Sequence, residues 1–237
     1  MRCGCFYTIL VRKSGPSVRC LGPRLQNFLW VVTSDGISSH VTLLTSQQPV
    51  GPSLKEAGAF SLVEVKVTSV EFSPGTQILY DNESADQIRG DLVWLGTESR
   101  RYYNIFSFIV SFKHSCGIGY YFRILLYSAH EPSKTGQVGS LNLPAPVVQL
   151  RYHWDQMFVA LANGIVAIFK RNSIEGVWEL NAPATLVSIG DEPVVSLLPI
   201  GSALYAACGR SVFVLDGITG EILVPNLSFA LVQDRNV

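Results

Sequence analysis

Side chains that could bind a metal ion are few and scattered. The cysteines are Cys3, Cys5, Cys20, Cys116 and Cys208, and the histidines are His40, His114, His130 and His153. Cys3 and Cys5 form a single C-x-C motif, and no second pair follows at the spacing of a four-ligand zinc site. No histidine has a second ligand at such a spacing. The sequence therefore predicts no metal ligands.

Two short segments contain residue types found in catalytic sites. His153-Trp154-Asp155 brings a histidine close to an aspartate, but it falls at a predicted turn, and no serine or cysteine nucleophile motif accompanies it. Asp191-Glu192 precedes a predicted strand, where a solvated turn is expected rather than an acid–base pair. No glycine motif for binding nucleotide phosphates is present. We predict no catalytic or cofactor-binding residues, no cofactor, and a protein that is not an enzyme.

Charge and cysteine content limit the partners and the compartment. Lys+Arg and Asp+Glu both number 18, whereas nucleic-acid binding usually requires a basic excess, so we expect no nucleic-acid partner. The apolar run 105–112 falls well short of the about 20 residues of a membrane-spanning helix, and we expect no membrane span. The odd number of cysteines argues against a disulfide framework. Reduced thiols in turn predict a cytoplasmic location.

An internal repeat in the second half defines the elements that hold these residues. Residues 146–150 (PVVQL) match residues 193–197 (PVVSL), 47 positions further on. The segment beginning at Val159 matches the segment beginning at Tyr205, at an offset of 46. Repeats of about 40–50 residues with four short strands are typical of β-propeller blades.

Each repeat predicts four strands separated by glycine-containing turns. We expect strands at 147–152, 156–162, 165–170 and 177–180, and then at 194–200, 203–208, 211–215 and 221–224. Asn163-Gly164 and Gly209-Arg210 suit tight turns that need positive φ. Upstream, weaker matches predict strands at 67–72, 92–97, 124–127 and 138–143, and earlier at 28–33 and 41–45. The fold class is all-β: a partial propeller of about three to four four-stranded blades.

Two segments interrupt this spacing. Residues 75–90 contain the polar run 81–86, which we interpret as a tolerated surface insertion, with a partner-binding loop as alternative. Residues 101–122 are too aromatic for a surface loop and stand where a short turn belongs. We interpret this second segment as translated intron from an imperfect gene model, with a partner-docking or membrane-touching hairpin as alternative. Residues 1–26 form a segment of uncertain structure, and 27–237 form the partial propeller.

Several phrases, in order, resemble a known family. They are LWVVTSDG at 29–36, LVWLGTE at 92–98, FVALANG at 158–164 and LYAACGRSVFVL at 204–215. This pattern resembles the C-terminal WD40-like propeller of the large Rho guanine-nucleotide exchange factors. The JNK-interacting scaffold proteins of the motor-adaptor type carry a related propeller and are the second choice.

The resemblance implies a regulatory role without catalysis. Exchange activity in that family resides in a Dbl-homology and pleckstrin-homology pair, which the resemblance does not reach. We therefore predict a protein-interaction propeller, a fragment of a Rho exchange factor, with a JNK-pathway scaffold or a propeller enzyme as alternatives. Its partners are proteins that the sequence does not name. A seven-blade ring needs roughly 300 residues, so we expect missing blades that are needed for stability.

Overall fold

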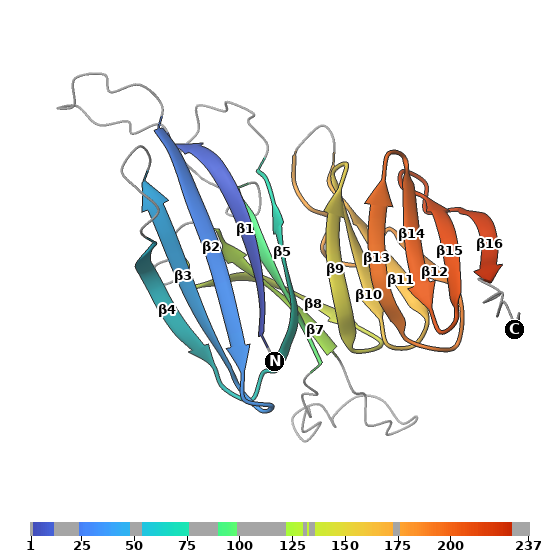
Figure 1. The fold of residues 1–237 in the computed structure, drawn as a ribbon, viewed down its shortest axis with the longest axis horizontal. Coiled ribbons are helices and arrows are strands. Elements are labelled where there is room, and N and C mark those ends of the chain that lie inside the picture. Colours follow the sequence, from blue (N-terminus) through green and yellow to red (C-terminus); the bar gives the residue numbers. More distant parts are fainter. Residues whose placement is uncertain are drawn as a thin grey trace, which may run out of the picture.

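The structure is a computed structural model that describes residues 2–11, 24–47, 54–75, 90–98, 122–129, 132, 136–172 and 176–228. Within these ranges, sixteen strands form four separate four-stranded antiparallel sheets (Figure 1). We call each sheet a blade and number the blades in chain order. None of the described residues forms a helix with the length and apolar character that a membrane crossing requires.

The first blade contains the longest strands, of 8 to 11 residues, whereas those of the second have 6 or 7. The first blade consists of β1 (Arg2–Val11), β2 (Arg24–Ser34), β3 (Ser39–Gln47) and β4 (Lys55–Leu62). The second blade consists of β5 (Val67–Ser73), β6 (Leu92–Thr97), β7 (Phe122–Ser128) and β8 (Gln137–Leu143). In both blades each strand pairs with the next one along the chain, so that simple up-and-down connections suffice.

The third and fourth blades correspond to the sequence repeat. The third blade consists of β9 (Val147–His153), β10 (Gln156–Leu161), β11 (Ile165–Lys170) and β12 (Thr185–Ser188). The fourth blade consists of β13 (Val194–Ile200), β14 (Ala203–Cys208), β15 (Ser211–Asp216) and β16 (Ile222–Ser228). The predicted all-β fold of three to four blades is confirmed, as are the predicted strands, apart from one strand and one register described below.

Turn chemistry explains where the strands end. Gly164 and Gly209 have φ of 77° and 57°, as the predicted hairpin turns require. Between β9 and β10, the same left-handed conformation is taken by Trp154 and Asp155, with φ of 47° and 57°. In the β2–β3 turn, Asp35 Oδ1 accepts hydrogen bonds from the amides of Ile37 and Ser38 at 2.9 and 2.7 Å.

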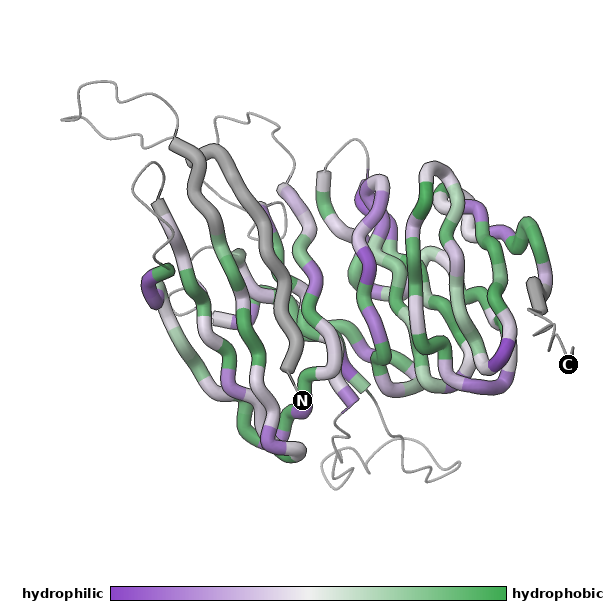
Figure 2. Tube along the Cα trace, viewed as in Figure 1, coloured by the Kyte–Doolittle hydropathy of each residue, from purple (hydrophilic) through white to green (hydrophobic). Residues whose placement is uncertain are grey.

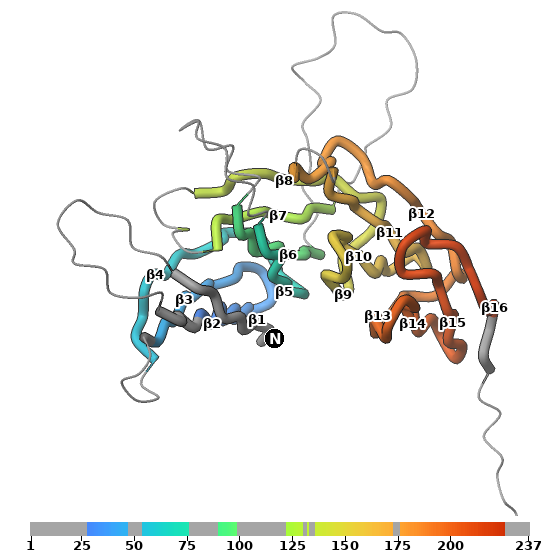
Figure 3. Tube along the Cα trace, turned by 90° about the horizontal axis from the view of Figure 1, so that it is seen from above, coloured from blue at the N-terminus to red at the C-terminus, as the bar shows by residue number. Residues whose placement is uncertain are grey.

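The blades lie in an arc with their first strands innermost. Figure 3 shows β1, β5, β9 and β13 near the centre and β4, β8, β12 and β16 at the periphery. Contacts between β1 and β5, β5 and β9, and β9 and β13 join neighbouring blades. Three apolar clusters fill the spaces between the first and second, second and third, and third and fourth blades. This arrangement is that of propeller blades around an axis.

One aromatic residue occupies the same position on the second strand of every blade. The positions correspond because each aromatic residue pairs with an aliphatic residue of the third strand. The pairs are Trp30 with Leu43, Trp94 with Leu126, Phe158 with Ile168, and Tyr205 with Val214. The first three aromatic side chains are fully buried against the next blade. Tyr205, in the fourth blade, is half-buried.

The predicted strand at 177–180 is wrong. The fourth strand of the third blade is β12, in which Thr185 pairs with Ile168. Trp178 makes only an isolated bridge with Arg171. Its indole packs edge-on against Trp94 of the second blade, with ring centroids 4.9 Å apart. The apolar pattern at 177–180 therefore reflects burial between blades and not a place in the ladder.

The predicted repeat register is wrong by one residue at the second strand. Phe158, not Val159, corresponds to Tyr205, because Arg151 pairs with Phe158 as Leu198 pairs with Tyr205. The offset is thus 47 in β10 and β14, and it becomes 46 only in β11 and β15. The reason is that three residues separate β10 from β11, whereas two separate β14 from β15.

The first blade begins earlier than predicted, and the two predicted insertions fall largely outside the described residues. Within residues 1–26, which we predicted as a segment of uncertain structure, β1 pairs with β2 along its whole length, so the first blade starts before residue 27. Of the predicted insert 101–122, only Phe122 is described; it is buried, begins β7 and pairs with Leu143. The remaining residues of that insert and residues 76–89 of the polar insertion lie outside the described residues.

Candidate functional site

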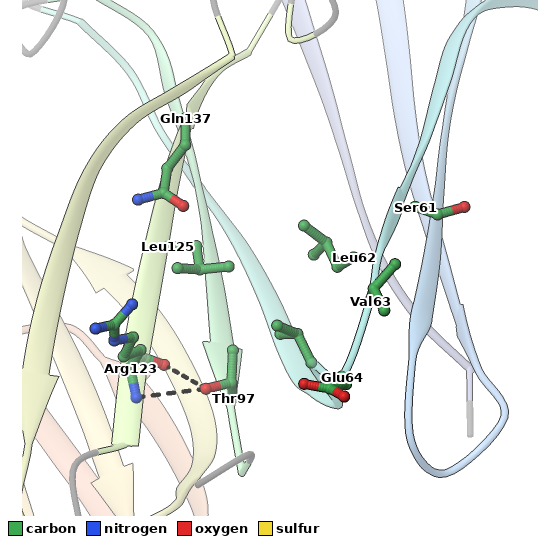
Figure 4. A pocket seen from close by; sticks show the side chains of 9 residues that line it. Ser61, Leu62, Val63, Glu64, Thr97, Arg123, Leu125 and Gln137 are labelled. Atoms are coloured by element: carbon green, nitrogen blue, oxygen red, sulfur yellow. Dashed lines mark hydrogen bonds between the residues drawn. The ribbon is translucent and has the colours of Figure 1, made fainter. Parts of the chain in front are cut away.

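A groove lies between the first and second blades. It has a volume of about 270 Å³. Its walls come from the end of β4 and the β4–β5 connection on one side and from β6, β7 and β8 on the other (Figure 4). The lining residues are Ser61, Leu62, Val63, Glu64, Val65, Thr97, Arg123, Leu125 and Gln137.

The first wall is held in place by the β2–β3 hairpin. Glu64 adopts the left-handed conformation with φ of 58°, which turns the chain sharply after β4. Its amide donates to Ser38 Oγ at 3.1 Å. The amide of Val67, at the start of β5, donates to Ser39 Oγ at 2.9 Å. Two serines of the first blade thus fix the path of the chain into the second blade.

The second wall is anchored by Thr97, the last residue of β6. Its buried hydroxyl donates to the carbonyl of Arg123 at 2.8 Å and lies 3.4 Å from the Arg123 amide. This contact joins the end of β6 to the start of β7, where the chain continues after residues 99–121. Beside it, Lys66 forms an ion pair with Glu98. The groove therefore lies next to the place where the long segment leaves and rejoins the blade.

The groove combines apolar and charged groups on facing walls. Leu62 and Leu125 approach the space from opposite sides, with Glu64 and Arg123 nearer one end (Figure 4). Such a lining can take an apolar side chain and hydrogen-bond the polar groups beside it. The nine lining residues include no histidine, cysteine or lysine, and no paired carboxylates.

The His153-Trp154-Asp155 segment makes structural contacts. His153 Nε2 lies 2.8 Å from the carbonyl oxygen of Gly201 in the next blade. Asp155 Oδ1 accepts a hydrogen bond from the Tyr152 hydroxyl at 3.0 Å and pairs with Arg171 Nη1 at 3.2 Å. Burial raises the pKa of the Tyr152 hydroxyl, and its hydrogen bond to Asp155 raises it further. The contacts of Asp155 stabilise the β9–β10 turn, and the contact of His153 joins the third blade to the fourth.

The Asp191-Glu192 segment lies beside the described free thiol, Cys208. Cys208 Sγ donates to the carbonyl of Glu192 at 3.0 Å. Burial raises the pKa of this thiol, and the negative charges of Glu192 and Asp191 raise it further. Such a thiol is a poor nucleophile because little of it is ionised at neutral pH.

The other candidate ligands do not come together in the described part of the chain. Cys3 and Cys5 belong to β1, where side chains are not described, and Cys20, Cys116, His114 and His130 lie outside the described residues. His40 is exposed, and its Nδ1 lies 3.1 Å from Ser61 Oγ. Among the described residues, no three His, Cys, Asp or Glu side chains gather in a way that could hold a metal ion.

Sequence reasoning missed the groove. Its residues come from four segments that are separated along the chain, and the inter-blade contact brings them together. The one local feature of the sequence is the end of the apolar alternation at residues 62–65. In the structure, Glu64 takes positive φ at this point. That turn carries no glycine, so the usual sequence mark of positive φ is missing.

Comparison with known proteins agrees with this fold. Residues 123–234 match the WD40 repeated domain. The four antiparallel blades and this match define an all-β, partial WD40-like β-propeller.

Curated relatives are Rho guanine nucleotide exchange factor 10-like proteins. The protein from Pongo abelii is 34% identical over 116 residues, which covers 48% of this chain and 9% of the relative. The protein from Mus musculus is 34% identical over 94 residues, covering 40% of this chain and 7% of the relative. The resemblance to the propeller of the Rho exchange factors is thus confirmed. The matched region spans less than a tenth of the length of these relatives.

Solved structures with a similar arrangement also occur. A crystal structure of BBS1N in complex with ARL6DN is 13% identical, with a TM-score of 0.48, and the match covers 87% of this chain and 63% of that one. The AfRom2 CNH domain is 8% identical, with a TM-score of 0.42, covering 89% of this chain and 59% of that one.

Proposed function

We propose that this chain is a non-catalytic protein-interaction propeller of a Rho guanine-nucleotide exchange factor. The observation that carries the proposal is the 34% identity to Rho guanine nucleotide exchange factor 10-like proteins over 116 residues, together with the WD40 match. In this role the blades hold a partner protein, and nucleotide exchange belongs to other parts of such factors. The names of the relatives favour this assignment over a JNK-pathway scaffold.

The groove between the first and second blades is the proposed partner site. It offers the apolar side chains of Leu62 and Leu125 beside the charged side chains of Glu64 and Arg123. This mixture is what a short extended segment of a protein needs for affinity and orientation. We place the protein in the cytoplasm, because its odd number of cysteines and the buried thiol of Cys208 suit a reducing compartment.

A nucleotide-exchange assay tests the non-catalytic part. Release of fluorescent GDP from a purified Rho GTPase is measured with the chain in excess, and a Dbl–pleckstrin homology pair serves as positive control. We expect release at the spontaneous rate. Acceleration that depends on the concentration of the chain would show that the chain is itself a catalyst.

Site-specific crosslinking tests the interaction part. A photo-crosslinking amino acid is placed at Val63, which lines the groove, or at Ile37, which lies in the β2–β3 turn and has the same exposure of 71%. We expect the probe at Val63, and not the probe at Ile37, to link the chain to a Rho-pathway protein in cells. Equal crosslinking from both positions would remove the groove as the partner site.

A further inference from the structure

An exposed tryptophan lies in the β9–β10 turn of the third blade. The two residues of this turn, Trp154 and Asp155, both have positive φ, at 47° and 57°. Glycine and asparagine adopt this conformation readily in a two-residue hairpin, whereas a bulky side chain is strained in it. The Trp154 side chain is nevertheless 52% exposed, so burial does not offset the strain.

The fourth blade forms the corresponding turn without a tryptophan. Two residues close the β9–β10 hairpin and two close the β13–β14 hairpin, and strand pairing places Gly201 where the third blade has Trp154. Gly201 has a φ of 59°, which costs glycine nothing in steric terms. The fold therefore does not require an aromatic side chain at this position. A strained and exposed side chain that the fold does not require points to a role in binding.

The tryptophan lies beside a contact between two blades that are both present in the chain. The His153 ring stacks on the indole, with centroids 5.1 Å and planes 19° apart. His153 Nε2 lies 2.8 Å from the carbonyl oxygen of Gly201, and a Cβ added at Gly217 would lie 3.6 Å from His153 Cδ2. The carbonyl of Ile218 accepts a hydrogen bond from Gln156 Nε2 at 2.9 Å. The β9–β10, β13–β14 and β15–β16 turns thus form one continuous surface, which we call the turn surface.

Carboxylates lie on two of these turns. Asp155, the second residue of the β9–β10 turn, is 65% exposed. Asp216 begins the β15–β16 turn, and its Oδ1 accepts hydrogen bonds from the amides of Thr219 and Ile218 at 2.7 and 2.8 Å. These bonds hold the pKa of the Asp216 carboxyl below its usual range, so it is ionised at neutral pH. Glu221, at the other end of the same turn, is exposed.

The cations near these carboxylates are less accessible. Arg171, which pairs with Asp155, is buried, and Lys170, which attracts Asp216, is half-buried. The charges that the turn surface presents to solvent are therefore mainly negative. An exposed indole among exposed carboxylates is complementary to a cationic side chain, which binds the face of the ring and the negative charges together.

We propose that the turn surface binds an arginine side chain from an extended basic segment of a partner protein. The guanidinium plane stacks on the indole of Trp154, and the carboxylates of Asp155 and Asp216 attract its charge. Arginine suits both contacts because its guanidinium group is planar, always charged and more weakly hydrated than an ammonium group.

The turn surface and the groove lie at opposite ends of the blades. Ser69 Oγ accepts from the amide of Leu150, and Glu71 Oε1 accepts from the amide of Tyr152, so β5 and β9 run side by side in the same direction. The groove adjoins the start of β5, whereas the turn surface follows the end of β9. Figure 2 shows a hydrophilic stretch where β9 turns into β10. Binding at one end can therefore be tested independently of binding at the other.

Titration of the full chain with an octapeptide of alternating arginine and glycine tests the proposal. The chain carries isotope-labelled tryptophan, so that each indole gives its own NMR signal. We expect the signal of Trp154, assigned by its loss in Trp154→Gly, to shift on binding, whereas the signals of the buried Trp30, Trp94 and Trp178 stay in place. The octapeptide with lysine in place of arginine should bind more weakly, and the one with glutamate should not bind.

Trp154→Gly separates binding from folding, because it gives this turn the residue that the fourth blade uses at Gly201. It should weaken peptide binding at least about tenfold and leave the free energy of unfolding in urea unchanged or higher. Asp216→Asn keeps Oδ1 for the turn but loses the charge, and should weaken binding about threefold. Glu56→Gln, exposed on β4, and Val63→Ser, in the groove, are the matched controls and should bind as the wild type does.

Four results would overturn the proposal. They are an unshifted Trp154 signal, equal binding of the arginine and lysine octapeptides, undiminished binding to Trp154→Gly, and a Trp154→Gly variant that is less stable than the wild type, since the indole would then belong to the fold. Loss of binding in Val63→Ser but not in Trp154→Gly would place the peptide in the groove and would equally reject the turn surface.

Discussion

Gly96 of the second blade faces Val147 of the third, with no room for a side chain between them. A Cβ added at Gly96 would lie 2.4 Å from Val147 Cγ1, well inside van der Waals contact. The corresponding position in the third blade is Ala160, which is fully buried against the fourth blade. The absence of a side chain at residue 96 therefore allows a closer approach of the two blades.

We expect Gly96→Ala to destabilise the protein by about 1–3 kcal/mol, because the added methyl group overpacks the blade contact. Urea denaturation gives the free energy of unfolding. Combining it with Val147→Ala should recover part of the loss, since the clashing methyl groups are then removed. Two losses that simply add would contradict direct contact as the cause.

The second prediction concerns a buried hydrogen bond. Trp94 Nε1 donates to Ser73 Oγ at 3.0 Å, and both side chains are fully buried. Ser73→Ala should cost about 1–3 kcal/mol, because the indole N–H loses its acceptor in a dry site. In the background of Trp94→Phe, which has no N–H to satisfy, the same change should cost clearly less. An equal cost in both backgrounds would mean that the hydrogen bond contributes nothing.

The sequence predicted this fold well wherever the repeat was visible. The turns at Gly164 and Gly209 and the strands on either side of them followed from apolar alternation and from the conformational freedom of glycine. The first blade was only half recognised, since β1 and β4 lie outside the 47-residue spacing and β4 carries a weak apolar pattern.

The remaining misses have a common cause in contacts between blades. Trp178 was assigned to a strand because an apolar residue near a turn resembles one, and only its packing on Trp94 identifies its role. The groove was invisible because Glu64 and Arg123 belong to different blades. A periodic pattern predicts which face of a strand is buried, but it does not predict what lies against that face.

Arg171 provides the third prediction, because it joins three groups around the contact of the second and third blades. Its side chain is nearly fully buried, donates to the carbonyl of Pro74 and pairs with Asp155, and its guanidinium carbon lies 4.7 Å from the Trp178 ring centroid. Arg171→Lys should cost about 1–3 kcal/mol, since an ammonium group cannot make these planar contacts together.

Asp155→Asn is the matched comparison for Arg171. Asp155 is 65% exposed, and a solvent-exposed ion pair contributes only about 0–1 kcal/mol. We therefore expect a clearly smaller loss in the free energy of unfolding than for Arg171→Lys, measured in the same urea titration. A larger loss for Asp155→Asn would show that the ion pair, and not the buried contacts, stabilises this joint.

Glu71 provides the last prediction, a pH dependence of stability. Burial raises the pKa of this carboxyl, although the amide of Tyr152 and the Arg151 guanidinium oppose the shift. Glu71 Oε1 accepts from the Tyr152 amide, and Oε2 lies 3.2 Å from Arg151 Nη1. A pKa that is higher in the folded than in the unfolded protein means that folding favours the protonated carboxyl. The contribution of Glu71 to stability is therefore fully present below its unfolded pKa and is lost as the pH rises through its folded pKa.

Glu71→Gln tests this sign, because glutamine stays neutral and keeps an oxygen for the Tyr152 amide. Thermal and urea unfolding of both proteins between pH 4 and 7.5 should show the variant gaining stability relative to the wild type as the pH rises. Arg151→Met removes one group that lowers the pKa of Glu71, so the wild-type loss with rising pH should become larger in that background. Parallel stability curves for Glu71→Gln and wild type, or a wild type that gains with pH, would mean that the inter-blade contacts of Glu71 outweigh its desolvation.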